Sequence, residues 1–455
     1  MDTAAAGQST HKRIPRKNLV QIAGGLLLFA VGSALPVIGG SPFAAAVVRW
    51  VGLAMLGLVG LRRRSLTFWI FFAMLAGLEL GIDRPQFAEH LQFLSNIFLR
   101  LIKVIVAPLI LGTLVTGIAS HGDLKAVGRL GLKSLVYFEA VTTVALVIGI
   151  AAINLTGAGL GLAVPATGAP PVQAGTAPPH WDDFLIHIFP ENIAKAVADN
   201  QILQVAVFAV LFGIALSLLP APKRAPMLQL AESLAQTMFS FTNIVMYFAP
   251  VGVGAAMAYT IGHMGISVLL PLGKLLLTAY GALTVFLVCV LLPIAWLARL
   301  PIARFVNAVA EPATIAFATS TSEAALPRAM EAMEAFGVPR RIVAFVIPAG
   351  YSFNLDGSTL YLALASVFVA QAAGIHMSWT EQAVMVFTLM LTSKGIAGVP
   401  RATLVVLLGM SSTFHLPPEP IFMILGIDAL IDMPRTSLNV VGNCLACAVM
   451  ARWEG

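Results

Sequence analysis

Apolar stretches recur along this sequence from Leu19 onward, each about 20 residues long and so able to cross the ~30 Å hydrocarbon layer of a bilayer as a helix. Hydrophobic residues make up 58% of the 455 residues and charged residues only 11%. An ordinary soluble domain has roughly 25% charged residues. The sequence therefore predicts an all-α integral membrane protein.

Short clusters of basic residues lie between the apolar stretches and contribute most of the formal net charge of +6. Because cytoplasmic loops are enriched in Lys and Arg, the clusters indicate membrane orientation rather than a nucleic-acid surface. The clusters "HKRIPRK" (11–17) and "RRR" (62–64) flank two apolar stretches, 19–40 and 43–60. These are expected to form an out-and-back pair from a cytoplasmic N-terminus. A cleaved signal peptide is the alternative for the first stretch, which lacks a clear A-x-A site.

The same charge rule orders the stretches that follow. Basic loops at 121–133, 220–226 and 298–304 are expected inside, and the Gly, Ala and Pro-rich segment 157–180 is expected to be an external loop. The predicted spans between these loops are 66–82, 88–118, 134–157, 190–219, 228–260 and 266–298.

The three cysteines, Cys289, Cys444 and Cys447, all lie inside apolar runs, so no disulfide framework is expected. Cys444 and Cys447 have C-x-x-C spacing, but a redox motif needs a soluble setting beside a βαβ pattern. We interpret them as small residues that pack between helices.

The pattern changes after residue 300. Residues 304–326 are polar for a membrane span and break at "ATSTSEAALP" (318–327), and basic loops expected on the cytoplasmic side lie both before and after them. A single crossing cannot join two loops on one side. This segment is therefore predicted to be a re-entrant hairpin, which is tolerated only where it lines an interior site.

The remaining segments repeat this arrangement from the other side. A span at 342–372 is interrupted by "NLDG" (354–357), and 382–412 carries "SKGIAGVPRA" (393–402) in the middle of an apolar stretch, before a last span at 418–450. Two hairpins, each followed by a broken or polar helix, outline an inverted repeat. Secondary transporters have this architecture, with the binding site near the middle of the membrane.

The last predicted helix carries a polar stripe. At 100° per residue Asp428, Asp432, Arg435, Asn439 and Asn443 share one face about 80° wide. A charge inside a membrane costs at least ~2.5 kcal/mol, so such a stripe is expected to line a partner or a ligand path. The alternative for Asp432 and Arg435 is simple mutual neutralisation. An arginine suits a carboxylate and an aspartate suits an ammonium, while hydroxyl and backbone N–H groups at a hairpin tip suit a second carboxylate. An acidic amino acid fits all three.

At the motifs "STSEAALP", "FNLDGSTLY", "SKGIAGVP" and "GIDALIDMPRTSLNVVGN" the sequence resembles the dicarboxylate/amino acid:cation symporter family, the glutamate transporter family, over residues 65–453. It looks most similar to the bacterial proton/glutamate symporters. The resemblance implies a glutamate-transporter-like fold with eight core transmembrane helices, two re-entrant hairpins and about two extra N-terminal helices. It also implies a homotrimer that works by an elevator-type movement in a bacterial inner membrane, with both termini cytoplasmic.

The resemblance also implies a division of the chain. Residues 1–64 would hold the N-terminal tail and the two extra helices, for which no function is predicted beyond packing on the scaffold rim. Residues 65–300 would hold mainly scaffold and trimerisation helices plus two transport-domain helices, and residues 301–455 the transport core.

Carried over by position, the resemblance assigns the substrate side-chain carboxylate to Arg435 and the amino group to Asp432. Asn439 and groups around Ser322 would hold the main-chain carboxylate. The substrate-binding residues implied in this way are Ser320, Thr321, Ser322, Ser358, Gly398, Val399, Asp432, Arg435, Thr436 and Asn439. The residues implied in cation coupling are Glu139, Thr142, Glu323, Asn354, Asp356, Asp428 and Asn443, with a possible sodium site at Asn354, Asp356, Asn439 and Asn443.

Two departures from the family pattern bear on the coupling ion. Sodium-coupled members carry an aspartate at the position of Asn443 and a hydroxyl residue at that of Val141, and losing an anionic oxygen weakens a sodium site. Glu139 and Glu323 lie where a bare carboxylate is costly, and burial favours its protonated form. Protons are therefore expected rather than sodium, although Glu139 could simply hydrogen-bond a neighbour.

The substrate class rests on Asp432. The motifs also resemble C4-dicarboxylate symporters of succinate, fumarate and malate, but a plain dicarboxylate has no ammonium to neutralise this aspartate.

A membrane enzyme is disfavoured because H-x-x-x-H, G-x-S-x-G and P-loop patterns are absent, and no cofactor is expected. A passive anion channel is the remaining alternative function. Arg401, at the second hairpin tip, either guides anions in or snorkels to the surface.

Overall fold

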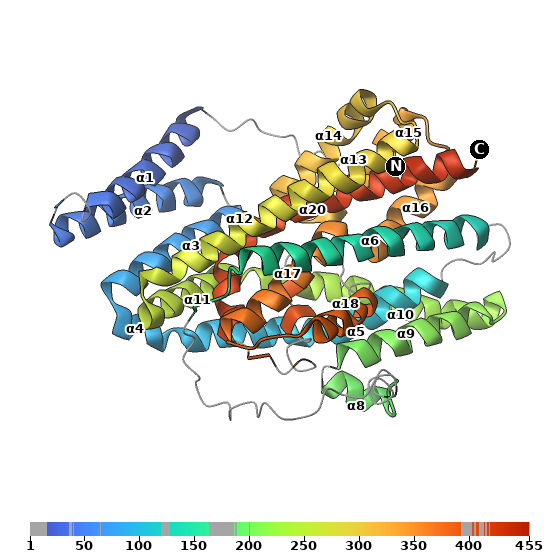
Figure 1. Cartoon of the computed structure of the whole chain (residues 1–455), viewed down its shortest axis with the longest axis horizontal. Helices are drawn as coiled ribbons and strands as arrows, with labels where there is room; N and C mark the ends of the chain where they lie inside the picture. The colour runs from blue at the N-terminus through green and yellow to red at the C-terminus, as the bar shows by residue number, and fades with distance from the viewer. Residues whose placement is uncertain are drawn as a thin grey trace, which may run out of the picture.

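The computed structural model describes residues 16–35, 41–63, 65–119, 128–162, 189–199, 201–392 and 419–454, with a few isolated residues between these ranges. The described residues form helices joined by turns, with no strand among them (Figure 1). The tip of the second predicted hairpin, 393–402, and most of the loop 157–180 lie outside the described residues.

The N-terminal pair consists of α1 (Arg16–Ala34) and α2 (Pro42–Arg63), which pack along each other. They lie at one end of the molecule, where α2 contacts α3 (Figure 1). α1 ends earlier than the predicted residue 40 because Pro36 disfavours helical backbone at the residue before it.

The next group contains α3 (Leu66–Asp83), the short α4 (Pro85–His90) and α5 (Gln92–Ala119). α3 crosses α11 (Ala249–Met264) closely, and a Cβ at Gly77 would overlap the carbonyl oxygen of Gly254. Because Gly77 has no side chain, the backbones of α3 and α11 can approach this closely.

Two predicted spans are each divided in two. The stretch 190–219 forms α8 (Ile193–Ala198) and α9 (Ile202–Ser217). The stretch 228–260 forms α10 (Ala221–Met246) and α11 (Ala249–Met264), bent by 52°. Pro250 explains this second break, since it has no N–H to donate to the Met246 carbonyl four residues earlier.

The predicted span 266–298 is one continuous run. It contains the short η2 (Ile266–Val268), α12 (Leu269–Phe286), a π-helical turn η3 (Leu287–Leu291) and α13 (Leu292–Leu297). Pro293 cannot donate a helical hydrogen bond, and the widened turn directly before it accommodates that loss.

The C-terminal third carries the predicted breaks. α14 (Ile302–Thr319) and α15 (Ser322–Phe336) form a helical hairpin, turning at Ser320, whose φ of 53° is left-handed. α16 (Arg340–Phe353) and α17 (Asp356–Ala372) are interrupted at residues 354–355, inside "NLDG". α18 (Trp379–Thr392) and the long α20 (Glu419–Glu454) follow.

Six helical runs in the described part of the chain are long and apolar enough to cross a membrane, and a seventh is possible if the bent pair α10–α11 counts as one span. The six are Pro42–Arg62, Leu66–Asp83, Pro85–Ala119, Arg129–Thr156, Ile266–Leu297 and Arg340–Ala372. The expected class, a multi-pass all-α membrane protein, is confirmed.

The core is centred on α17. Every residue from Asp356 to Ala372 except Gln371 is buried. The surrounding helices are α6 (Gly128–Thr156), α12, α18 and α20 (Figure 1). Because α17 begins at the helix interruption (residues 354–355) that follows α16, its polar first turn lies inside the protein rather than at a surface. This buried helix start positions the site.

Candidate functional site

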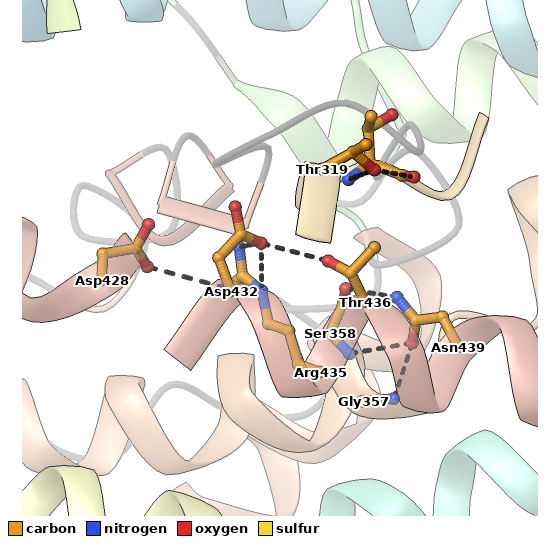
Figure 2. Close-up of polar contacts among 9 residues, drawn as sticks. Thr319, Gly357, Ser358, Asp428, Asp432, Arg435, Thr436 and Asn439 are labelled. Carbon is orange, nitrogen blue, oxygen red and sulfur yellow. Dashed lines mark hydrogen bonds and ion pairs between the residues drawn. The ribbon is translucent and has the colours of Figure 1, made fainter. Parts of the chain in front are cut away.

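Asn439 of α20 caps the first turn of α17. Its Oδ1 accepts hydrogen bonds from the backbone N–H groups of Gly357 (2.8 Å) and Ser358 (3.2 Å), and its Nδ2 donates to Ser358 Oγ (2.9 Å) (Figure 2). The first N–H groups of a helix have no partner within the helix. One side chain from a distant part of the sequence satisfies two of these N–H groups. Hydrogen bonds therefore hold α17 and α20 together at the helix interruption.

Arg435 is 1% exposed and lies against two aspartates of its own helix. Its Nη2 is 2.6 Å and its Nε 2.8 Å from Asp432 Oδ1, and its Nη1 is 3.7 Å from Asp428 Oδ1. Thr436 Oγ1 donates to the same Asp432 oxygen at 3.3 Å. Figure 2 shows these side chains along one face of α20. The guanidinium is therefore neutralised locally, with one carboxylate held tightly and the other more loosely.

Tyr361 supplies an aromatic face to this group. The ring, on α17, has its centroid 4.8 Å from the Arg435 guanidinium carbon, and the side chain is fully buried. A desolvated cation over an aromatic ring gains about 2 kcal/mol. The sequence analysis did not identify this residue, although Tyr361 follows Ser358 by three positions and so lies on the same helix face.

Tyr280 of α12 supports the helix that carries the arginine. Its hydroxyl donates to the Leu430 carbonyl oxygen at 2.9 Å. Pro434, four residues after Leu430, has no N–H to donate to that carbonyl. Sequence reasoning missed this contact too, and the proline in the polar stripe was the available signal.

A second polar cluster lies one turn beyond Asn439. Asn354 Nδ2 donates to Asn443 Oδ1 at 3.1 Å and lies 3.3 Å from Asp356 Oδ2. All three side chains are buried, and a Cβ at Gly442 would overlap Asp356 Oδ2. Asn354 Oδ1 and Asn443 Nδ2 have no hydrogen-bond partner among the described residues. Buried amide atoms are nearly always satisfied, so this cluster has capacity for a further polar group or ion.

The predicted hairpin tip lies beside α20. Ser437 Oγ donates to the Ala313 carbonyl of α14 at 3.0 Å. Ser320 and Ser322 are buried. Thr321 is half-buried, and its backbone N–H and C=O both contact Thr319 Oγ1 (Figure 2). The hydroxyl-rich turn is thus placed next to the helix that carries the polar stripe.

The other predicted residues are more scattered. Thr142 is buried on α6, where its hydroxyl donates to the Phe138 carbonyl at 2.6 Å, and Glu139 is half-buried one turn away. Glu323 is exposed in the first turn of α15, although the sequence analysis expected it where a carboxylate is costly. Gly398, Val399 and Arg401 lie outside the described residues.

All five residues of the polar stripe point into protein, and none is more than 3% exposed. A buried guanidinium next to carboxylates and amides can hold an anion and a cation side by side, since each charge has an opposite partner. Such a site, built from helix breaks inside a multi-span helical protein, defines a membrane transporter of small charged molecules.

Comparison with known proteins agrees with this class. Residues 66–453 match the sodium:dicarboxylate symporter family, so the chain belongs to that family and is a transporter, not an enzyme. Residues 1–65 fall outside the match, and the resemblance identified from the motifs is confirmed.

Three relatives illustrate the range within the family. The proton/sodium-glutamate symport protein of Bacillus caldotenax is 40% identical over 404 residues, which cover 87% of this chain and 96% of the relative. The proton/glutamate-aspartate symporter of Escherichia coli (strain K12) is 42% identical over 406 residues, covering 86% and 93%. The C4-dicarboxylate transport protein of Solibacter usitatus (strain Ellin6076) is 42% identical over 399 residues, covering 86% and 93%.

Proposed function

We propose that this protein is a secondary active symporter that imports glutamate or aspartate together with cations. The observation that carries the proposal is the buried Arg435 between Asp432 and Asp428. An acidic amino acid has a carboxylate for the guanidinium and an ammonium for the aspartate. The names of the Bacillus caldotenax and Escherichia coli relatives support this substrate class.

The substrate would exchange partners with the site rather than add to it. Arg435 is already paired with Asp432 within α20. A side-chain carboxylate that takes over the guanidinium leaves Asp432 as a buried charge with a weakened partner, which costs several kcal/mol unless a new cation arrives. The substrate ammonium supplies that cation, and Asn439 with the hairpin-tip hydroxyls would hold the main-chain carboxylate.

A C4-dicarboxylate symporter is the second candidate, and the Solibacter usitatus relative favours it. A dicarboxylate would reach Arg435 equally well but would bring no ammonium to Asp432. Protonation of Asp432, or a coupling cation bound beside it, would then have to supply the missing charge.

We propose protons as the coupling ions, with sodium as the alternative. In the second cluster only Asp356 can carry a negative charge, because Asn354, which donates to it, and Asn443, which accepts from Asn354, have neutral amide side chains. A hard cation prefers several charged oxygens, so this cluster is a weak sodium site as it stands. Glu139, half-buried on α6, is the proposed proton carrier, with Glu323 and Asp428 as further candidates. Sodium would instead use the oxygens of Asn354, Asp356, Asn439 and Asn443.

The proposed architecture follows the family. Helices α6, α12, α14 to α18 and α20 would form the transport core, with re-entrant hairpins at 304–326 and 382–412, and α3, α5 and α9 to α11 would form the scaffold. The packing of α17 against α6 and α20, and of α3 against α11, supports this division. The core would slide against the scaffold in an elevator-type movement within a homotrimer, with eight core helices and both termini cytoplasmic in a bacterial inner membrane.

The deciding experiment is uptake into proteoliposomes with the sodium and proton gradients varied independently. We expect radiolabelled aspartate to accumulate above its external concentration when only a pH gradient is imposed. Excess glutamate should abolish this uptake and excess succinate should not. Equilibration without accumulation would identify a passive channel, and strict dependence on sodium would overturn the proton assignment. Stronger competition by succinate would establish the dicarboxylate alternative.

A further inference from the structure

The helix pair α1–α2 carries a buried charge that the family assignment does not explain. Arg49, in the middle of an apolar run of α2, is 7% exposed, and residues 1–65 lie outside the family match. A charged side chain inside a membrane helix is costly and needs a partner. The partners of Arg49 come from two other helices.

Arg49 binds the acidic face of α3. Its Nε is 2.8 Å from Glu79 Oε1 and 2.6 Å from Glu79 Oε2, and its Nη2 is 3.6 Å from Asp83 Oδ1. Its Nη1 donates to the Gly32 carbonyl of α1 at 3.2 Å. One guanidinium therefore ties together α1, α2 and α3.

The neighbouring residue makes a second contact to the same surface. Trp50 Nε1 donates to Asp83 Oδ2 at 2.7 Å. Glu79 and Asp83 are four residues apart and so lie on one face of α3. Two consecutive residues of α2 thus recognise two carboxylates one helical turn apart, which fixes the register of the hairpin along α3.

Glu79 depends on this contact. The side chain is 0% exposed, and within the described part of the chain Arg49 is the basic residue that pairs with it. Without Arg49 this carboxylate would be a buried charge with no cation, the arrangement that costs most in an interior. The buried charge of Glu79 on α3 therefore depends on Arg49 of the hairpin, and the buried charge of Arg49 depends on Glu79.

We propose that the Glu79–Asp83 face of α3 is a docking surface whose occupant is the α1–α2 hairpin, residues 16–63, and that Arg49 is the ion that holds it there. The hairpin is then a fixed extension of α3, and lipid molecules do not replace it on the Glu79–Asp83 face. It belongs to the same body as α3, which packs on α11, and stays with that body when the rest of the protein moves.

A double-mutant cycle on the full-length protein in detergent tests the ion pair, with melting temperature as the readout. Arg49→Gln should lower the melting temperature by about 5 °C, because it leaves Glu79 buried without its cation. Adding Glu79→Gln to that variant should recover a large part of the loss, since both ends of the pair are then neutral. Arg62→Gln, an exposed arginine of the same helix, is the matched control and should change nothing.

Two outcomes of the double-mutant cycle would contradict the proposal. If the losses from Arg49→Gln and Glu79→Gln simply add, the two residues act independently and the proposal is wrong. If Arg49→Gln alone does not fold, the double variant still decides. Recovery of folded protein supports the ion pair, and equal failure of both variants overturns it. None of these outcomes depends on transport activity.

Cross-linking tests the docking itself. A Cβ at Gly57 of α2 would lie 3.4 Å from the Phe72 ring of α3. In a background where Cys289, Cys444 and Cys447 are replaced, Gly57→Cys with Phe72→Cys should be joined by a short bismaleimide. Arg49→Gln should reduce the yield at least threefold, and Arg62→Gln should not. An unchanged yield with Arg49→Gln would show that the ion pair does not hold the hairpin.

The same cross-link has a functional readout, which rests on the proposed symport. A hairpin fixed to α3 can be covalently joined to it without loss of uptake. Uptake that survives before cross-linking and disappears after it would show that the hairpin must move against α3. Absence of uptake in the unmodified protein would count against the proposed function and leave the melting and yield measurements to judge the docking.

Discussion

The Tyr280 hydroxyl donates a hydrogen bond to the Leu430 carbonyl at 2.9 Å, the carbonyl that Pro434 cannot satisfy within its own helix. This contact lies in the stretch of α20 that carries Asp428, Asp432 and Arg435. Because hydrocarbon offers no replacement donor, a lost bond here cannot be made good by solvent. A tyrosine from α12 thereby holds the part of α20 on which the candidate site depends.

Tyr280→Phe should therefore destabilise the protein by about 1 to 2 kcal/mol, the cost of leaving a carbonyl without a donor. The measurement is chemical unfolding of the purified protein in micelles. Tyr247→Phe, at a tyrosine that is 77% exposed, is the matched control and should be neutral. Equal stability of the two variants would remove Tyr280 from this role.

Asp432→Ser should shift selectivity from acidic amino acids toward plain dicarboxylates, because the substituted site no longer requires an ammonium. Competition of unlabelled aspartate and succinate against a labelled substrate measures the ratio. Asp199→Ser removes an exposed carboxylate elsewhere and should leave the ratio unchanged. An unaltered preference in Asp432→Ser would dissociate Asp432 from the amino group.

Tyr361→Leu should weaken substrate binding by about tenfold or more, since the ring, in a contact worth about 2 kcal/mol, holds the Arg435 guanidinium in the position that receives the substrate carboxylate. Tyr361→Phe keeps the ring and should bind within about threefold of the unmodified protein. Titration calorimetry with aspartate gives both dissociation constants. Similar weakening in the two variants would mean that the ring face is not what matters.

Glu139→Gln should uncouple uptake from an imposed pH gradient, because an amide cannot carry a proton, while exchange of internal for external substrate persists. Uptake in sodium-free buffer at several pH gradients is the measurement. Glu331→Gln, at an exposed glutamate of α15, should retain the full response. A normal pH response in Glu139→Gln would assign the proton to another carboxyl group.

The C-terminal end of α20 predicts a pH dependence of stability. Hydrogen bonds from Lys133 (2.6 Å) and Arg129 (3.0 Å) lower the pKa of Glu454 from 4.5 to about 2. With 36 residues, α20 is longer than a bilayer crossing requires, so this last residue projects beyond the hydrocarbon. Since the folded-state pKa is depressed, the contribution is complete above pH 4.5 and is lost as the pH falls toward 2.

Comparing the melting temperatures of the unmodified protein and Glu454→Gln across this range checks the assignment. The difference should be constant at neutral pH and should shrink on acidification below pH 4.5. A difference that grows as the pH falls would contradict it, because a carboxylate that is losing its charge cannot gain from two basic partners.

Hydropathy located the six stretches that form long apolar helices, since length and apolar content are local properties, whereas the predicted spans 19–40 and 190–219 contain shorter apolar helices. The break inside "NLDG" and the turn at Ser320 were predictable for the same reason. The bend after Met246 could have been read from Pro250, but an apolar run on both sides hid it.

Periodicity placed the polar stripe of α20 on one face, but it could not say what that face meets. The caps that Asn439 makes to α17, the Tyr361 ring and the Tyr280 hydroxyl all come from helices far away in sequence. Arg49 gave no local signal of its partner either, because Glu79 is thirty residues away. Tertiary contacts of this kind depend on how helices pack and not on any one of them.

Helices α17 and α20 bury three aspartates, Asp356, Asp428 and Asp432, and one arginine, Arg435. When all four are ionised, the excess is two negative charges, which would move with the transport core proposed above. Each elementary charge carried across the full membrane potential corresponds to ~2.3 kcal/mol per 100 mV. In the elevator-type movement proposed above, the membrane potential would therefore act on the core whenever substrate and coupling cation do not neutralise these charges.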